Sequence, residues 1–151
     1  MTNPKGTFNE TASAKWLRAN GFPMADRKVR RGSRDEGDLD LSPGLIAEVK
    51  AYRLPTGMPT AGQLDGWLAQ AAAEKEHAGA AYCPLIVKRP GTTDVGRWFA
   101  YLPAADFALL TGAFLPRDVD DVPVMLPVSG MALVFRSAGY GEPLTPIGEA
   151  A

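Results

Sequence analysis

The residues with the clearest capacity for chemistry lie on either side of a Pro-Gly turn. Asp38 and Asp40 precede the turn, and Glu48 and Lys50 follow it. Alternate side chains of a strand point to one face, so Glu48 and Lys50 share a face, as do the two aspartates on the neighbouring strand. Carboxylates that meet across such a hairpin can share a divalent cation. The pattern indicates the outline of a metal-dependent nuclease site.

The register of the hairpin decides whether the carboxylates meet, because a slip of one residue sends every side chain to the opposite face. A three-residue loop over 42–44 places Asp38 opposite Glu48, with Cβ atoms roughly 4.5–5.5 Å apart. A two-residue loop over 43–44 places Asp38 opposite Val49 and separates the carboxylates. Turn chemistry leaves both registers open, and we adopt the three-residue loop. An ordinary half-exposed hairpin with alternating charge remains the alternative to a site.

Composition narrows the possible chemistry. The chain of 151 residues is long enough for one domain, and it has a single cysteine, Cys83, and a single histidine, His77. Catalysis would therefore rest on carboxylates and lysines, and oxygen ligands favour Mg²⁺ or Mn²⁺ over zinc. No apolar run is long enough to span a bilayer, and residues 1–6 lack a signal-peptide core. We expect a cytoplasmic protein without membrane partners.

The net charge of −1 hides an uneven distribution of charge. Residues 1–60 hold ten Lys/Arg against seven Asp/Glu, a balance of +3, whereas residues 61–151 hold six against ten, a balance of −4. Basic side chains beside an acidic metal site can bind the phosphates of the same nucleic acid, although a solvated charged face is the simpler explanation. Five of these basic residues form a cluster within eight positions just before the acidic hairpin: Arg27, Lys28, Arg30, Arg31 and Arg34.

The spacing Thr7 to Glu10 is that of a capping box, and it predicts a helix that runs to Asn20 and stops at Gly21. Glu10 then has two possible roles: it completes the cap, or it directs a third carboxylate toward the metal site. The cap is the preferred interpretation, and the two roles are compatible.

The remaining pattern predicts an α/β fold, with a sheet covered by helices on at least one face. We assign residues 1–110 to the main domain and 111–151 to a C-terminal extension. The expected elements are an extended segment 22–30, a turn 31–37, a loop 53–61, a helix 61–78 with Leu64, Leu68, Ala71 and Ala72 buried, a strand 82–88, an edge strand 95–101, a helix 104–110, possible strands 122–128 and 131–136, and a disordered tail from Gly139.

In their order and spacing, several short motifs over residues 5–101 resemble the PD-(D/E)xK nuclease superfamily, and more narrowly the phage and archaeal Holliday junction resolvases. This chain differs by having Gly37 where the name-giving proline usually lies, and by offering Asp35 and Asp40 as rival aspartates. The motifs are Lys5-Gly6-Thr7 with Glu10, the basic segment from Arg27, Gly37-Asp38, Glu48-Val49-Lys50, the helix around Trp67 and Gln70, and Val87-Lys88-Arg89.

The resemblance implies a restriction-endonuclease-like core, a mixed central sheet flanked by helices. It also implies that Asp38, Glu48 and the Val49 carbonyl hold Mg²⁺ or Mn²⁺, that Lys50 orients water or stabilises phosphate charge, and that Glu10 is the helical glutamate. The expected function is Holliday junction cleavage by a homodimer. Other nucleases of this superfamily, or a module that binds nucleic acid without cutting it, are the alternatives. The basic residues expected to contact DNA are Arg27, Lys28, Arg30, Arg31, Arg34 and Lys88.

Overall fold

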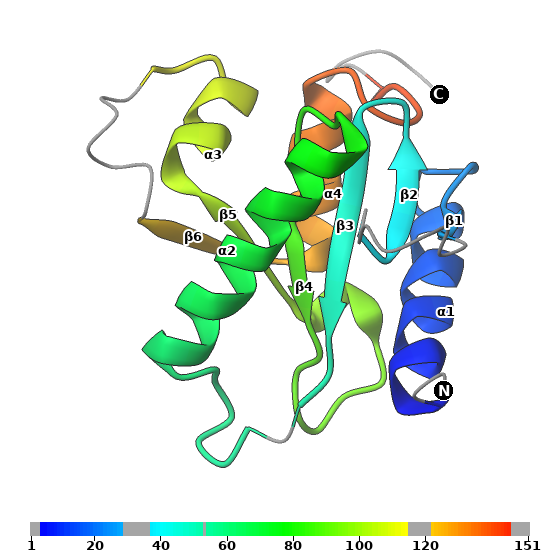
Figure 1. The fold of residues 1–151 in the computed structure, drawn as a ribbon. Coiled ribbons are helices and arrows are strands. Elements are labelled where there is room, and N and C mark those ends of the chain that lie inside the picture. Colours follow the sequence, from blue (N-terminus) through cyan, green and yellow to red (C-terminus); the bar gives the residue numbers. More distant parts are fainter. Residues whose placement is uncertain (1–3, 29–36, 53, 115–121, 146–151) are drawn as a thin grey trace.

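The computed structural model describes residues 4–28, 37–52, 54–114 and 122–145. It is an α/β fold in which a mixed six-stranded sheet, in the order β1-β2-β3-β4-β5-β6, is flanked by helices (Figure 1). Among the strand pairs of these described residues, only β3 and β4 run parallel. The elements are α1 (Pro4–Ala19), β1 (Asp26–Arg27), β2 (Leu39–Ser42), β3 (Leu45–Lys50), α2 (Ala61–Ala78), β4 (Leu85–Val87), η1 (Val95–Arg97), β5 (Phe99–Pro103), α3 (Ala104–Leu110), β6 (Pro123–Pro127) and α4 (Val128–Ser137).

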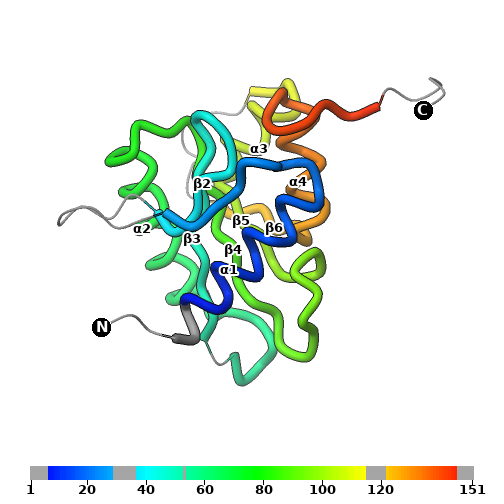
Figure 2. The backbone as a smooth tube through the Cα atoms, turned by 90° about the vertical axis from the view of Figure 1, so that its right-hand side faces the viewer, coloured from blue at the N-terminus to red at the C-terminus, as the bar shows by residue number. Residues whose placement is uncertain are grey.

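Helices cover both faces of the sheet. Helix α2 lies on one face, where Leu85, Val87 and Tyr101 form a core cluster with its apolar side chains. Helices α1 and α4 share the cluster on the opposite face with Val49 and Ile86. Figure 2 shows α2 and α4 on opposite sides of the central strands. No helix in the described ranges is both long and apolar enough to cross a membrane.

Helix α2 has the predicted bounds because both of its ends are fixed locally. Thr60 and Gln63 form a capping box, and Gly79 ends the helix in the left-handed conformation, with φ 64°. Ala71 is buried as expected, but Ala72 is exposed, so that part of the predicted face is wrong. Helix α1 begins at Pro4 rather than after Thr7, and the predicted cap at Thr7 is therefore wrong as well.

Two predicted strands are shorter than expected, and one is misplaced within the sheet. Strand β4 covers only Leu85–Val87 of the predicted 82–88. The predicted edge strand 95–101 begins with the 3₁₀ turn η1, capped by the Asp94 side chain, and its strand, β5, lies between β4 and β6. It is not an edge strand, because β6 pairs along its whole length.

The C-terminal segment completes the sheet and the core. The strand predicted over 122–128 is confirmed as β6, but the strand predicted over 131–136 is wrong, since these residues lie in α4. Met131, Ala132 and Phe135 are buried at helical spacing, which explains the choice of helix. Residues 139–143 contradict the predicted disordered tail, because Tyr140 packs against Phe135 and Arg136 donates to the Glu142 and Pro143 carbonyls.

This packing gives a first testable prediction. We expect Phe135→Ala to lower the free energy of unfolding by about 3–5 kcal/mol, because the ring is 1% exposed and leaves a cavity in the main core. Leu133→Ala, on the same helix but 51% exposed, should cost less than about 1 kcal/mol. Urea unfolding of both variants measures the difference. Equal losses would show that α4 does not belong to the cooperative core.

Candidate active site

The hairpin between β2 and β3 has a two-residue turn and a bulge. Ser42 pairs with Leu45, so the predicted three-residue loop is wrong. The register then shifts between Asp40 and Ser42, and Leu39 pairs with Ala47. A bulge adds one residue to one strand. Beyond the bulge, the register of this hairpin is therefore the one that the three-residue loop would give. The paired register ends at Leu39, so it does not include Asp38, and the predicted pairing of Asp38 with Glu48 stays a prediction. The charge of Asp38 nevertheless acts on the Glu48 carboxyl group.

Asp38 lies at the edge where β2 separates from β3. Its backbone N–H donates to the Ala47 carbonyl at 3.0 Å, and its Oδ2 accepts the Val49 N–H at 2.8 Å. In a strand, the N–H and C=O of one residue point toward the same neighbour, so the Val49 carbonyl faces this edge too. Two of the predicted metal ligands, the Asp38 carboxylate and the Val49 carbonyl, therefore lie on the same side of β3, the side that faces β2.

Glu48 and Lys50 lie on the face covered by α2, and a glutamine of that helix connects them. Lys50 Nζ lies 3.3 Å from Glu48 Oε1 and donates to Gln70 Oε1 at 2.8 Å. Gln70 Nε2 donates to Glu48 Oε1 at 3.3 Å and to Glu74 Oε1 at 3.0 Å. Gln70 thus fixes the lysine and both glutamates in one hydrogen-bonded network.

The electrostatics of this network are unusual because two carboxyl groups are buried together. Glu48 is 2% and Glu74 1% exposed. Burial, the hydrogen bond with Glu74 and the charge of Asp38 raise the pKa of Glu48 to about 11, against the smaller opposing effect of Lys50. With both carboxyl groups ionised, Oε2 of Glu48 is buried without a hydrogen-bond donor in the described structure. The site therefore favours a proton or a cation at this position.

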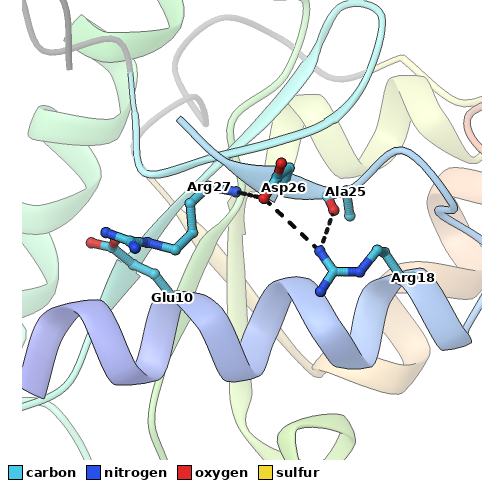
Figure 3. Close-up of polar contacts among 5 residues, drawn as sticks. All are labelled: Glu10, Arg18, Ala25, Asp26 and Arg27. Carbon is cyan, nitrogen blue, oxygen red and sulfur yellow. Dashed lines mark hydrogen bonds and ion pairs between the residues drawn. The ribbon is translucent and has the colours of Figure 1, made fainter. Parts of the chain in front are cut away.

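Glu10 reaches the same region from α1. It pairs with Arg27 at 3.1 Å, as the neighbouring side chains in Figure 3 show. Burial and the charge of Asp38 raise the pKa of Glu10, while Arg27 opposes the shift. The preferred capping role is wrong, because Glu10 lies well inside the helix. Its carboxyl group also lies within hydrogen-bond reach of Asp38 and joins those of Asp38, Glu48 and Glu74 in the site.

The other predicted residues are only partly brought together. Lys28 pairs with the rival aspartate Asp40 at 3.5 Å. The backbone N–H of Lys88 donates to the Lys50 carbonyl, but its ammonium group lies over the Trp98 ring, 5.9 Å from the centroid. Arg30, Arg31, Arg34 and Asp35 lie outside the described residues.

Glu74 is the functional candidate that sequence reasoning missed. It follows Gln70 by four residues, so both side chains lie on one face of α2. A carboxylate one helical turn after a glutamine, directly after the run Ala71 to Ala73, was the available signal. The pattern points to a site only once α2 is packed on β3, because that packing brings Gln70 and Glu74 next to Glu48.

The residues fit a magnesium or manganese ion in their chemistry. All the candidate donors are oxygens, and Mg²⁺ is usually held by one or two carboxylates together with water and substrate phosphate. Asp38, Glu48 and the Val49 carbonyl would hold it. In the described ranges, no group of three His, Cys, Asp or Glu side chains is arranged to bind a metal, so the expected set relies on two carboxylates and one backbone oxygen.

Comparison of the chain with known proteins adds no assignment to this geometry. No family model, no curated protein and no solved structure matches it.

Proposed function

We propose that the protein is a DNA endonuclease dependent on Mg²⁺ or Mn²⁺, built on a restriction-endonuclease-like core of the PD-(D/E)xK type. The single observation that carries the proposal is the buried Glu48–Lys50–Gln70 network next to Asp38. A carboxylate whose pKa is raised to about 11 costs stability unless a cation or proton satisfies it. Such perturbed groups cluster at functional sites.

Each residue of the site would have a separate role in the hydrolysis of the phosphodiester bond. A bound metal would supply a Lewis acid for the phosphate and a water of lowered pKa. Lys50, fixed by Gln70, places a positive charge where negative charge develops on the phosphate as water attacks phosphorus and the bond to the leaving oxygen breaks. Arg27 of β1, held by Glu10, and Lys28, which follows that strand, would bind flanking phosphates.

We further propose a branched substrate, such as a Holliday junction, and a homodimer that would cut two strands. Sequence reading requires elements that reach base edges in a groove. In the described part of the C-terminal segment, β6 pairs with β5 and α4 packs into the core, so neither element extends from the fold toward a DNA groove. Recognition of DNA shape is the better match to such a chain.

The test compares the purified protein with Lys50→Ala on a labelled four-way junction, a matched linear duplex and a single strand, with Mg²⁺, Mn²⁺ or EDTA. We expect metal-dependent cutting of the junction, and a rate about 100-fold to 1,000-fold lower for Lys50→Ala, the usual cost of one lost charge-stabilising donor. Lys15→Ala, which changes an exposed lysine of α1, is the matched control and should cut normally.

Each other result has a definite meaning. Cutting of all three substrates would retain the nuclease and remove the junction preference. Binding of the junction without cutting in either metal would contradict the catalytic proposal and favour a binding module.

A further inference from the structure

A partly exposed aromatic pair lies beside the candidate active site. The Tyr52 ring stacks on Trp67 of α2, with centroids 5.3 Å apart and planes inclined by 25°. Trp67 packs against the core cluster that contains Leu54 and Phe99. Tyr52 remains 57% exposed. The Trp67 ring is thus held against the core, whereas the Tyr52 ring is open to solvent.

The chain connects this pair directly to the catalytic network. Tyr52 follows Lys50 by two residues, so their Cα atoms are at most about 7 Å apart. Trp67 precedes Gln70 by three residues on α2, and residues at this spacing are neighbours on a helix surface. Since Gln70 accepts a hydrogen bond from Lys50, the aromatic pair and the lysine lie next to each other.

Arg89 adds a cationic side chain at the same end of the two parallel strands. The Lys88 N–H donates to the Lys50 carbonyl, which places the ends of β3 and β4 together. Exposed Arg89 lies with its guanidinium 5.5 Å from the centroid of Phe99, a member of the cluster that supports Trp67. Aromatic platforms combined with cations are the usual means by which proteins hold single-stranded nucleic acid.

We propose that Tyr52 and Trp67 form a stacking platform for one unstacked nucleobase of the DNA substrate, beside the phosphate that is cut. A base inside an intact duplex cannot reach such a platform, and extruding it costs a few kcal/mol, least where pairing is already disturbed. The platform would therefore select DNA with an unpaired or weakly paired nucleotide at the cleavage position. The inference rests on the proposed nuclease function for the position of the scissile phosphate.

The test uses a 12-nucleotide single strand with a central 2-aminopurine, titrated with the full-length protein in EDTA so that no cutting occurs. Stacking on an aromatic ring quenches this fluorescent base. We expect quenching by the unaltered protein and a dissociation constant about 5-fold to 150-fold higher for Tyr52→Ala, equivalent to about 1–3 kcal/mol per stacked base. Tyr52→Phe keeps the ring and should bind normally. Phe114→Ala, which removes another exposed ring (84% exposed), is the matched control.

The outcomes separate this inference from the proposed function. If Tyr52→Ala quenches and binds like the unaltered protein, the pair only fastens the loop after β3 to α2, and the platform is overturned even when the junction is still cut. Loss of quenching in Tyr52→Phe would equally overturn stacking, because the ring is retained. If the unaltered protein quenches but cuts no DNA with either metal, the platform stands as a single-strand site and the nuclease proposal fails. Thermal unfolding of each variant confirms that it is folded.

Discussion

Glu48→Gln should abolish metal-dependent cleavage, with a fall in rate of about 1,000-fold or more, while the protein remains folded. The substitution removes one of the two carboxylates expected to hold the metal, and the Lewis-acid contribution of a metal is worth several kcal/mol. The carbonyl of the new amide can still accept the hydrogen bond from Gln70. The amide is uncharged at every pH, so the variant avoids the cost of keeping a proton on the buried Glu48 carboxyl group, whose pKa is raised to about 11. Stability in EDTA should therefore be equal to or higher than that of the unaltered protein.

The measurement is the initial rate of junction cleavage in Mg²⁺ and in Mn²⁺, together with thermal unfolding in EDTA. Glu76→Gln is the matched control, since Glu76 is an exposed glutamate of α2. It should leave both the rate and the stability unchanged. Cleavage by Glu48→Gln within a few-fold of normal would show that Glu48 is not a ligand of the metal, and the site would need another carboxylate. Unfolding of the variant would show instead that Glu48 has a structural role.

Local signals were sufficient for some of the site, and long-range packing decided the rest. Helix α2 could be predicted because Thr60 and Gly79 fix its ends within the helix itself. The common face of Glu48 and Lys50 follows from the two-residue period of a strand. Gln70 joins Glu74 of α2 to Glu48 of β3, and no local pattern encodes the bond between Gln70 and Glu48, which are 22 residues apart in sequence.

The register of the hairpin shows the same limit. In the structure Pro43 and Gly44 form a two-residue turn, with Gly44 at φ 79°, and such a turn alone would separate the two carboxylates. The bulge restores the register while Leu39 and Leu41 both remain buried. Whether a strand takes up an extra residue depends on what its faces pack against, which a short sequence window does not contain. The helical form of α4 was missed for a related reason, since short apolar runs suit either a strand or a helix.

The second large effect concerns stability and pH in the absence of metal. The Glu48 carboxyl group has a pKa of about 11 in the folded protein, raised by burial first, against an ordinary value of 4.5. Between these values the folded state binds one more proton than the unfolded state. The contribution of Glu48 to the free energy of unfolding is therefore fully present below about pH 4.5 and is lost as the pH rises toward 11. The linkage slope is about −1.4 kcal/mol per pH unit for one proton.

In EDTA, the free energy of unfolding should fall by about 3 kcal/mol between pH 6 and pH 8, the direction opposite to that of an ordinary carboxylate in a salt bridge. Urea unfolding at pH 6, 7 and 8 and constant ionic strength measures it. Glu48→Gln carries no titrating group at this position, so its slope should be close to flat, whereas Glu76→Gln should keep the full slope. Saturating Mg²⁺ should also flatten the profile, since a bound cation would replace the proton. Stability that rises with pH over this window, or a slope that persists in Glu48→Gln, would contradict the assignment of the buried proton to Glu48.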